Sequence, residues 1–254
     1  MFLNYIYHIC KTMRLSVLIH LYYEDTAIGV YKKLGALLGH FENNINFFIN
    51  LPTDHPKKNS LVSACKNKLP NCVIIQTSNV GKDIGGKLAL MHTYIKLNMN
   101  ADLLLFLHDK KSPQTAVGEN WSDQLFEMID QKSIEKTLEL FNDQSIGMVG
   151  QKNHIYNKKN RTEEEIFVGN KQKILALAKE YDLCSPNLDF IGGTMFWVRE
   201  SIFKDFFKKN DPLQIRVSLE RGNVLDDLGP TITHSWERLF GWVVSTYGFK
   251  IAGV

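Results

Sequence analysis

Two polar loops, each directly after an apolar run, hold most of the residues that could bind or activate a ligand. The first loop, SNVGKDIGGK at 78–87, follows the run CVIIQ. The second loop, HDKK at 108–111, follows the run LLLFL. Ligands of α/β proteins bind beyond the carboxyl ends of parallel strands. The two loops therefore predict a site for a nucleotide or another phosphorylated ligand.

The first loop has the G-x-x-x-x-G-K spacing of a phosphate-binding P-loop, ending at Lys87. Leu88, however, stands where a serine or threonine would hold magnesium, and the loop follows the third predicted strand instead of the first. A broader interpretation is that the glycines Gly81, Gly85 and Gly86 bring the backbone close to a ligand. Lys82 and Asp83 would then make polar contacts. A tight strand-to-helix turn is the structural alternative.

The second loop gathers ionisable groups at the end of a buried strand. Asp109 is suited to a divalent metal that bridges a diphosphate. Lys110 and Lys111 are suited to neutralising the diphosphate directly, each as a point charge. A solvated charged turn is the alternative, although it explains poorly why a buried strand should end in this cluster.

Gly192 and Gly193 interrupt an apolar run at 189–198. Glycines inside a strand indicate a bulge or a close approach of the backbone to a ligand. The residues around them (Met195, Phe196 and Val198) are more typical of a core than of a binding surface.

Glu237 follows His234 by three residues, so both lie on one face of a predicted helix. A carboxylate at this position could act as a general base towards an acceptor hydroxyl. A salt bridge at the helix end, with Arg238 or Lys250, is the alternative. Just upstream, Asp226 and Asp227 compete with Glu237 for the role of base.

The composition is that of an ordinary globular protein. The 254 residues are 44% hydrophobic and 22% charged, and a net charge of +3 without a basic face or motif does not indicate nucleic-acid binding. The four cysteines lack the paired spacing of a zinc site, so we expect buried, reduced thiols in a cytoplasmic protein. Residues 1–13 form an apolar stretch that is shorter than the roughly 20 residues of a membrane span. We expect this extension to be dispensable.

The apolar pattern predicts the elements that position these loops. Strands are expected at 14–22, 45–50, 72–76, 102–107, 146–149 and 189–198. Helices are expected at 25–39, 60–69, 86–97, 120–141, 168–181, 200–207 and 234–247, with a polar loop or flap at 153–165. Alternation of strand and helix predicts an α/β fold with a mostly parallel, Rossmann-like sheet flanked by helices. No linker divides the chain, so we expect a single domain at 14–254.

Four segments occur in a fixed order: N-x-G-K-D-I-G at 79–85, L-H-x-K-K-S at 107–112, G-G-T-M-F-W-x-R at 192–199 and H-x-x-E-R-L-F-G at 234–241. Together with the run IGMVG at 146–150, they resemble the rhamnan synthesis F family of bacterial polysaccharide glycosyltransferases. The resemblance covers about residues 14 to 250, and the joint pattern is specific where a single segment would not be.

The resemblance implies a GT-A-like glycosyltransferase, with a nucleotide-sugar-binding half at 14–113 and an acceptor half at 114–254. The implied reaction moves a sugar, with rhamnose as the expected one, from dTDP-rhamnose or a similar donor. The acceptor would be a growing cell-surface polysaccharide, such as lipopolysaccharide O-antigen, or a lipid-linked glycan. A lipid-linked acceptor would bring the protein to the inner face of the cytoplasmic membrane by peripheral contact, without a transmembrane span, and the basic loop 158–161 agrees with this.

The resemblance and the residue types together give the expected site residues. The expected donor contacts are Tyr22, Asn79, Gly81, Lys82, Asp83, Gly85, His108, Asp109, Lys110 and Lys111. Gly193, Thr194, His234 and Arg238 are expected beside the transferred sugar or the acceptor. Glu237 is the expected base of an inverting displacement, with Asp227 as second choice. Stacking of Tyr22 on the donor base and packing in the core are equally good interpretations of that residue.

One departure from the GT-A pattern concerns metal. Such enzymes usually carry Asp-x-Asp, whereas Asp109 is followed by Lys110 and Lys111. Mn2+ or Mg2+ at Asp109 is one hypothesis, and a metal-independent reaction in which the two lysines stabilise the leaving diphosphate is the other. Two further classes stay open: a P-loop-like nucleotide phosphotransferase that depends on Lys87, and a non-catalytic sugar-nucleotide or glycan-binding module.

Overall fold

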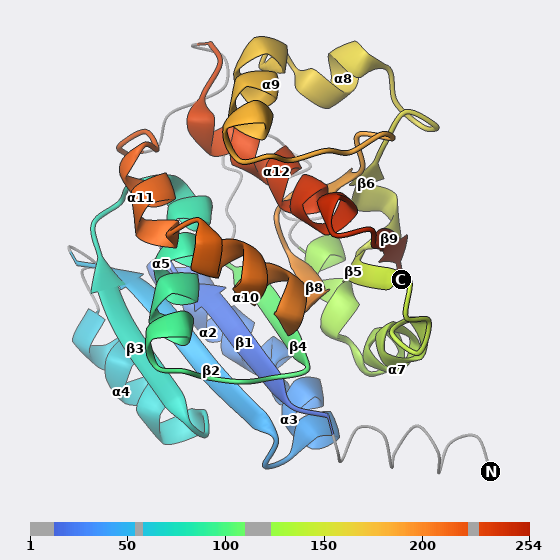
Figure 1. Ribbon diagram of the computed structural model, residues 1–254. Coiled ribbons are helices and arrows are strands. Elements are labelled where there is room, and N and C mark those ends of the chain that lie inside the picture. Colours follow the sequence, from blue (N-terminus) through green and yellow to red (C-terminus); the bar gives the residue numbers. More distant parts are fainter. Residues whose placement is uncertain (1–12, 54–57, 110–122, 223–228) are drawn as a thin grey trace.

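The computed structural model describes residues 13–53, 58–109, 123–222 and 229–254. A seven-stranded sheet of order β3-β2-β1-β4-β8-β5-β9 crosses the molecule (Figure 1). Its first four strands are mutually parallel: β1 (Leu15–His20), β2 (Ile45–Pro52), β3 (Cys72–Thr77) and β4 (Leu103–His108). β1 and β4 are buried along their whole length, as their unbroken apolar runs predict. The expected mostly parallel sheet flanked by helices is confirmed.

The later part of the chain extends the same sheet. β8 (Phe196–Arg199) lies antiparallel between β4 and β5 (Ile146–Gly150), and β9 (Lys250–Gly253) pairs with β5 in parallel. A separate two-stranded sheet joins β6 (Ile155–Tyr156) to β7 (Phe190–Ile191). The run expected as one strand at 189–198 is therefore two strands in different sheets, because the backbone turns at Gly193 and Thr194, whose φ angles are +81° and +54°.

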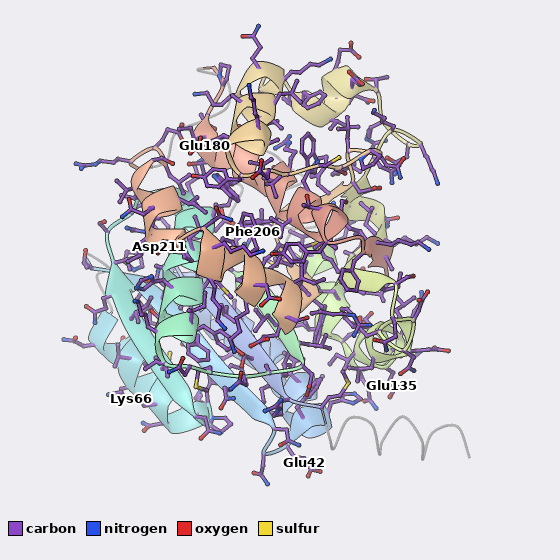
Figure 2. The ribbon with its side chains drawn as sticks, in the orientation of Figure 1. Glu42, Lys66, Glu135, Glu180, Phe206 and Asp211 are labelled. Carbon is purple, nitrogen blue, oxygen red and sulfur yellow. The ribbon has the colours of Figure 1, made fainter. Side chains whose placement is uncertain are left out.

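Helices cover both faces of the sheet. One face carries α5 (Lys82–Lys96), α10 (Glu200–Lys209), α11 (Pro212–Val217) and α12 (Ile232–Thr246). The other face carries α2 (Glu24–Lys33), α3 (Gly35–Phe41), α4 (Lys58–Lys68) and α7 (Gln131–Leu140). Two further helices, α8 (Glu163–Phe167) and α9 (Lys171–Glu180), lie beyond α12 at the top of Figure 1. In Figure 2, Phe206 of α10 lies in the packed interior, whereas exposed charged residues such as Lys66 and Glu180 lie at the rim.

Several expected helices begin or end elsewhere in the structure. The helix expected at 25–39 is divided into α2 and α3. The helix expected at 168–181 begins only at Lys171, because Val168 adopts a left-handed conformation at φ +44°. In the region expected as one helix at 120–141, a 3-10 turn η1 (Glu127–Ile129) precedes α7, whose first turn Asp130 caps by accepting a hydrogen bond from Ser133 N. The expected loop at 153–165 contains a 3-10 turn η2 (Lys152–His154), β6 and the start of α8.

The structure tests the expected burial of the cysteines and the expectation that no segment spans a membrane. Cys65, Cys72 and Cys184 carry free thiols, and Cys10 lies outside the described residues. Of these three described cysteines, Cys65 is buried, Cys72 is half-buried and Cys184 is exposed, so the expectation of four buried thiols is wrong. Within the described part of the chain, none of the helices is long and apolar enough to cross a bilayer.

Candidate active site

The glycine-rich stretch after β3 is mainly the first turns of a helix. α5 begins at Lys82, four residues before the expected start, with Gly81 as its N-cap at φ +71°. A Cβ atom at Gly85 would lie 1.8 Å from Val80 O, and one at Gly86 would lie 2.2 Å from His20 Nδ1. Close packing of α5 against β1 and β2 therefore accounts for Gly86, and the tight turn at Val80 before the helix accounts for Gly85. Their expected approach to a ligand stays a prediction.

Lys87 is the most deeply buried charged residue of this region, with 1% of its surface exposed. Its Nζ donates to Asp83 Oδ2 at 2.8 Å, Thr194 O at 2.7 Å and Thr194 Oγ1 at 2.6 Å. His108 Nδ1 lies 3.0 Å from the same Nζ. A P-loop lysine must reach the ligand's phosphates. Since Lys87 is turned inward onto protein acceptors, the P-loop interpretation does not fit this geometry.

Asp83 and Thr194 complete this cluster. Thr194 Oγ1 donates to Asp83 Oδ2 at 2.5 Å, and His108 Nδ1 lies 3.7 Å from the same oxygen. Burial by itself would raise the pKa of Asp83, but the charges of Lys87 and His108 and the hydrogen bonds it accepts hold that pKa well below its ordinary value. The carboxylate is therefore kept ionised. The cluster joins α5 of the first half to the turn before β8.

Glu237 lies on α12 and faces the same turn. Its Oε1 accepts a hydrogen bond from Gly193 N at 2.7 Å, and its Oε2 pairs with Arg238 at 2.6 Å. Arg238 is buried, donates also to Ile166 O and His234 O, and stacks over Phe190. A carboxylate offers about four lone-pair sites, so Glu237 can accept further hydrogen bonds. Both the general base and the salt bridge to Arg238 are compatible with this geometry.

His234 and Lys82 form a second contact between the halves. Thr231 caps α12, and its Oγ1 lies 2.5 Å from His234 Nδ1. Lys82 Nζ lies 3.5 Å from His234 Nε2. Glu220 accepts hydrogen bonds from Thr233 Oγ1, Thr233 N and Ile232 N at the start of α12. Burial opposes the charge, but these bonds lower the pKa of Glu220.

Asp109 organises the turn after β1. Its Oδ1 accepts from Tyr22 N at 2.8 Å, and its Oδ2 accepts from Tyr23 N at 2.6 Å. The rings of Tyr22 and Tyr23 pack edge to face. Among the residues that the structure describes, no group of three or more His, Cys, Asp or Glu side chains could hold a metal ion. These residues alone do not form a metal centre, so we derive no step through a metal.

A polar row that the sequence did not single out lies beside this cluster. His20 ends β1 in register with His108 of β4, and its Nδ1 lies 2.9 Å from Asn50 Nδ2. Asn50 Oδ1 accepts from Thr77 Oγ1. Each of these polar residues lies at or near the carboxyl end of an apolar run in the sequence. This position is the feature by which the sequence could have indicated them. The expected site residues Lys110, Lys111 and Asp227 lie outside the described residues.

A family model described as "Rhamnan synthesis protein F" matches residues 3–249. The chain belongs to this family. The description of the family agrees with the expected role in polysaccharide synthesis. No curated protein sequence matches the chain.

The solved structures that resemble this family member have low sequence identity to it. A mannosyltransferase from Pyrobaculum calidifontis, in complex with GDP-Man and Mn2+, has a TM-score of 0.49 at 12% identity, covering 100% of this chain and 62% of that one. TarS from S. aureus, with UDP-GlcNAc, has a TM-score of 0.42 at 14% identity, covering 76% and 47%. The chain thus spans less than two thirds of the length of these two.

Glucosyl-3-phosphoglycerate synthase from Mycobacterium tuberculosis, with UDP, has a TM-score of 0.43 at 12% identity, covering 97% of this chain and 84% of that one. At TM-scores below 0.5, these likenesses carry no conclusion about the activity of this member of the rhamnan synthesis F family.

Proposed function

We propose that the chain is a glycosyltransferase that moves rhamnose from dTDP-rhamnose, or a similar sugar from its nucleotide donor, to a growing polysaccharide or lipid-linked glycan. The observation that carries the proposal is the meeting of the residues expected on the donor side with those expected on the acceptor side. Asp83 contacts Thr194, and Lys82 lies near His234. Family membership supports the class of product.

In the proposed reaction the halves have separate tasks. Residues at the start of α5 and at the end of β4 bind the nucleotide diphosphate, with Lys110 and Lys111 as the expected cations. The start of α12 and the turn at 192–195 receive the acceptor. Glu237, held between Gly193 N and Arg238, takes the proton of the acceptor hydroxyl as its oxygen bonds to the anomeric carbon. The bond from that carbon to the nucleoside diphosphate breaks on the opposite face, so this single displacement inverts the configuration. Asp227 is the competing base.

Location and metal use belong to the same proposal. A lipid-linked acceptor would place the protein at the inner face of the cytoplasmic membrane through peripheral contact. The two lysines after Asp109 favour a reaction in which protein cations stabilise the leaving diphosphate. Activity that is lost in chelator and restored by Mn2+ or Mg2+ would overturn the metal-independent form of the proposal.

The test begins with a thermal-shift screen against dTDP-rhamnose, UDP-sugars, GDP-sugars and ATP, because a ligand that binds only the folded state raises the melting temperature. We expect one nucleotide-sugar group to stabilise the protein and Lys110→Ala to remove the shift. Stabilisation by ATP alone would contradict the proposal.

Transfer to a rhamnose-containing oligosaccharide then tests catalysis. Glu237→Gln keeps an oxygen for Gly193 N but cannot take a proton, so transfer should fall by about 10²–10⁴-fold. Exposed Glu180→Gln serves as the matched control. Donor binding without transfer to any acceptor would favour the non-catalytic binding module. If Glu237→Gln retains full activity, Asp227→Asn becomes the deciding variant.

A further inference from the structure

Lys87 occupies a position in which a lysine is rarely found. A buried ammonium group is costly unless it is paired and hydrogen-bonded. The ammonium group has three protons and donates to Asp83 Oδ2, Thr194 O and Thr194 Oγ1, with His108 Nδ1 within reach. Two of these three acceptors belong to one residue of the other half of the chain. Two of the hydrogen bonds of Lys87 therefore hold Thr194 against α5.

Thr194 needs such support. It is a β-branched residue at φ +54°, a backbone conformation that costs free energy and persists only when its surroundings enforce it. The preceding Gly193 has φ +81°, and a Cβ atom there would lie 2.9 Å from Leu125 Cδ1. The carbonyl and hydroxyl of Thr194 are both bound to Lys87, so this lysine fixes the turn from the side of α5.

The same turn carries the N–H group that orients Glu237. Gly193 N donates to Glu237 Oε1 at 2.7 Å, one residue before the carbonyl that Lys87 binds. A continuous chain of contacts therefore runs from Lys87 through Thr194 and Gly193 to the carboxylate.

We propose that Lys87 is a positioning residue that sets the Glu237 carboxylate by fixing the turn at Gly193 and Thr194. It acts without touching the substrate. The catalytic consequence rests on the proposed function, because Glu237 acts as a base only if the chain transfers a sugar. The structural half of the proposal concerns the protein without substrate.

The chain offers a matched control for this lysine. Lys204 on α10 is also largely buried, and it pairs with Glu200 four residues earlier, as Lys87 pairs with Asp83. Lys204 Nζ donates to Met99 O and Asn100 Oδ1 instead of to the turn. Lys204→Met thus removes a buried ion pair of the same kind from another place.

The first experiment compares hydrogen exchange of the protein alone in Lys87→Met, Lys204→Met and the wild type. We expect exchange in the peptide 190–196 to be at least about tenfold faster in Lys87→Met, because an amide opens more often once its turn is released. In Lys204→Met this peptide should match the wild type. Unchanged exchange in Lys87→Met would overturn the proposal.

The second experiment separates positioning from loss of folded protein. Calorimetric titration with the nucleotide sugar found in the screen gives the stoichiometry of binding, which counts the folded fraction. We expect Lys87→Met to keep that stoichiometry and a donor Kd within about threefold, while kcat for transfer falls at least about 50-fold. A kcat that falls only in proportion to the stoichiometry, or equally in Lys204→Met, would overturn the proposal.

A second pair of variants serves if Lys87→Met does not fold. Thr194→Ala removes one acceptor of Lys87 without leaving a buried charge unpaired, and Thr194→Ser keeps the hydroxyl. We expect faster exchange and lower kcat in the alanine variant and rescue of both in the serine variant. Equal behaviour of the two would contradict the proposal. A wild type that binds no nucleotide sugar would overturn the proposed function and the catalytic consequence, whereas normal exchange with normal transfer would overturn the positioning role alone.

Discussion

Burial governs the chemistry of single residues at the carboxyl end of the sheet. His20 is almost fully buried, its Nε2 has no hydrogen-bond partner among the described residues, and burial lowers its pKa to about 4. The imidazole therefore stays neutral in the folded protein across the physiological range. It contributes to the site as a neutral polar group next to the Lys87 cluster.

This shift makes stability depend on pH. The unfolded imidazole takes up a proton near pH 6.5 and the folded one only near 4, so the unfolded state binds more protons between these values. Stability is present above pH 6.5 and is lost as the pH falls from there towards 4. We expect the titration of His20 to lower the free energy of unfolding by about 2 kcal/mol when the pH falls from about 7.5 to about 5. Urea unfolding at the two pH values measures this loss.

His20→Gln is the variant that checks this pH dependence, since glutamine does not titrate. Whatever the absolute stability of this variant, its free energy of unfolding should change much less between pH 7.5 and pH 5 than that of the wild type. His40 contributes a residual slope, because burial also lowers its pKa. An equal slope in His20→Gln and the wild type would show that another group causes the loss.

At the scale of elements, α5 shows how packing overrides helix propensity. Alanine in place of glycine inside a helix is worth up to about 1 kcal/mol. A Cβ atom at Gly86 would lie 2.2 Å from His20 Nδ1 and 3.0 Å from Asn50 Nδ2, whereas Gly29 in α2 has nothing within 4 Å. We expect Gly86→Ala to destabilise by about 1–3 kcal/mol and Gly29→Ala to stabilise by about 0.5–1 kcal/mol. Chemical denaturation of both variants measures whether their free energies of unfolding change in opposite directions.

The element scale also shows what the sequence can predict. β1, β2, β3 and β4 were predicted because continuous apolar runs of strand length are typical of a buried parallel sheet. The sequence predicts the start of α5 four residues too late because glycines favour loops, although in this helix they permit close packing. α11 and β9 were missed because they are short.

For the candidate site, the sequence indicates which segments belong together, and the roles of the residues stay predictions. Contacts among Asp83, Thr194, Gly193 and Glu237 lie within the segments 79–85, 192–199 and 234–241. The inward turn of Lys87 and the row at His20 could not be predicted, because they depend on which strand lies next to which. The antiparallel insertion of β8 between β4 and β5 likewise leaves no local signal in the sequence.

At the scale of the whole molecule, the sheet ties the two halves together. β8 of the second half pairs with β4 of the first, and one core cluster contains both Ile49 of β2 and Trp197 of β8. Side chains that share a core cannot be exposed separately without opening that core. We therefore expect residues 14–113 and 114–254 to unfold in a single cooperative transition.

Ile49→Ala tests this cooperativity. Ile49 is fully buried in β2, whose neighbours β1 and β3 both belong to the first half, so the substitution should cost about 2–5 kcal/mol. The tryptophans lie at 121, 197, 236 and 242, all in the second half, and Trp197 also packs against Phe41 of the first half. Their fluorescence therefore reports on the second half and on its contact with the first. Because we expect one transition, the urea midpoint of Ile49→Ala should be lower than that of the wild type by the same amount whether it is measured by fluorescence or by far-UV circular dichroism. A fluorescence midpoint that stays at the wild-type value would show that the halves unfold independently, and the contact of Lys87 with Thr194 would then join two separate folding units.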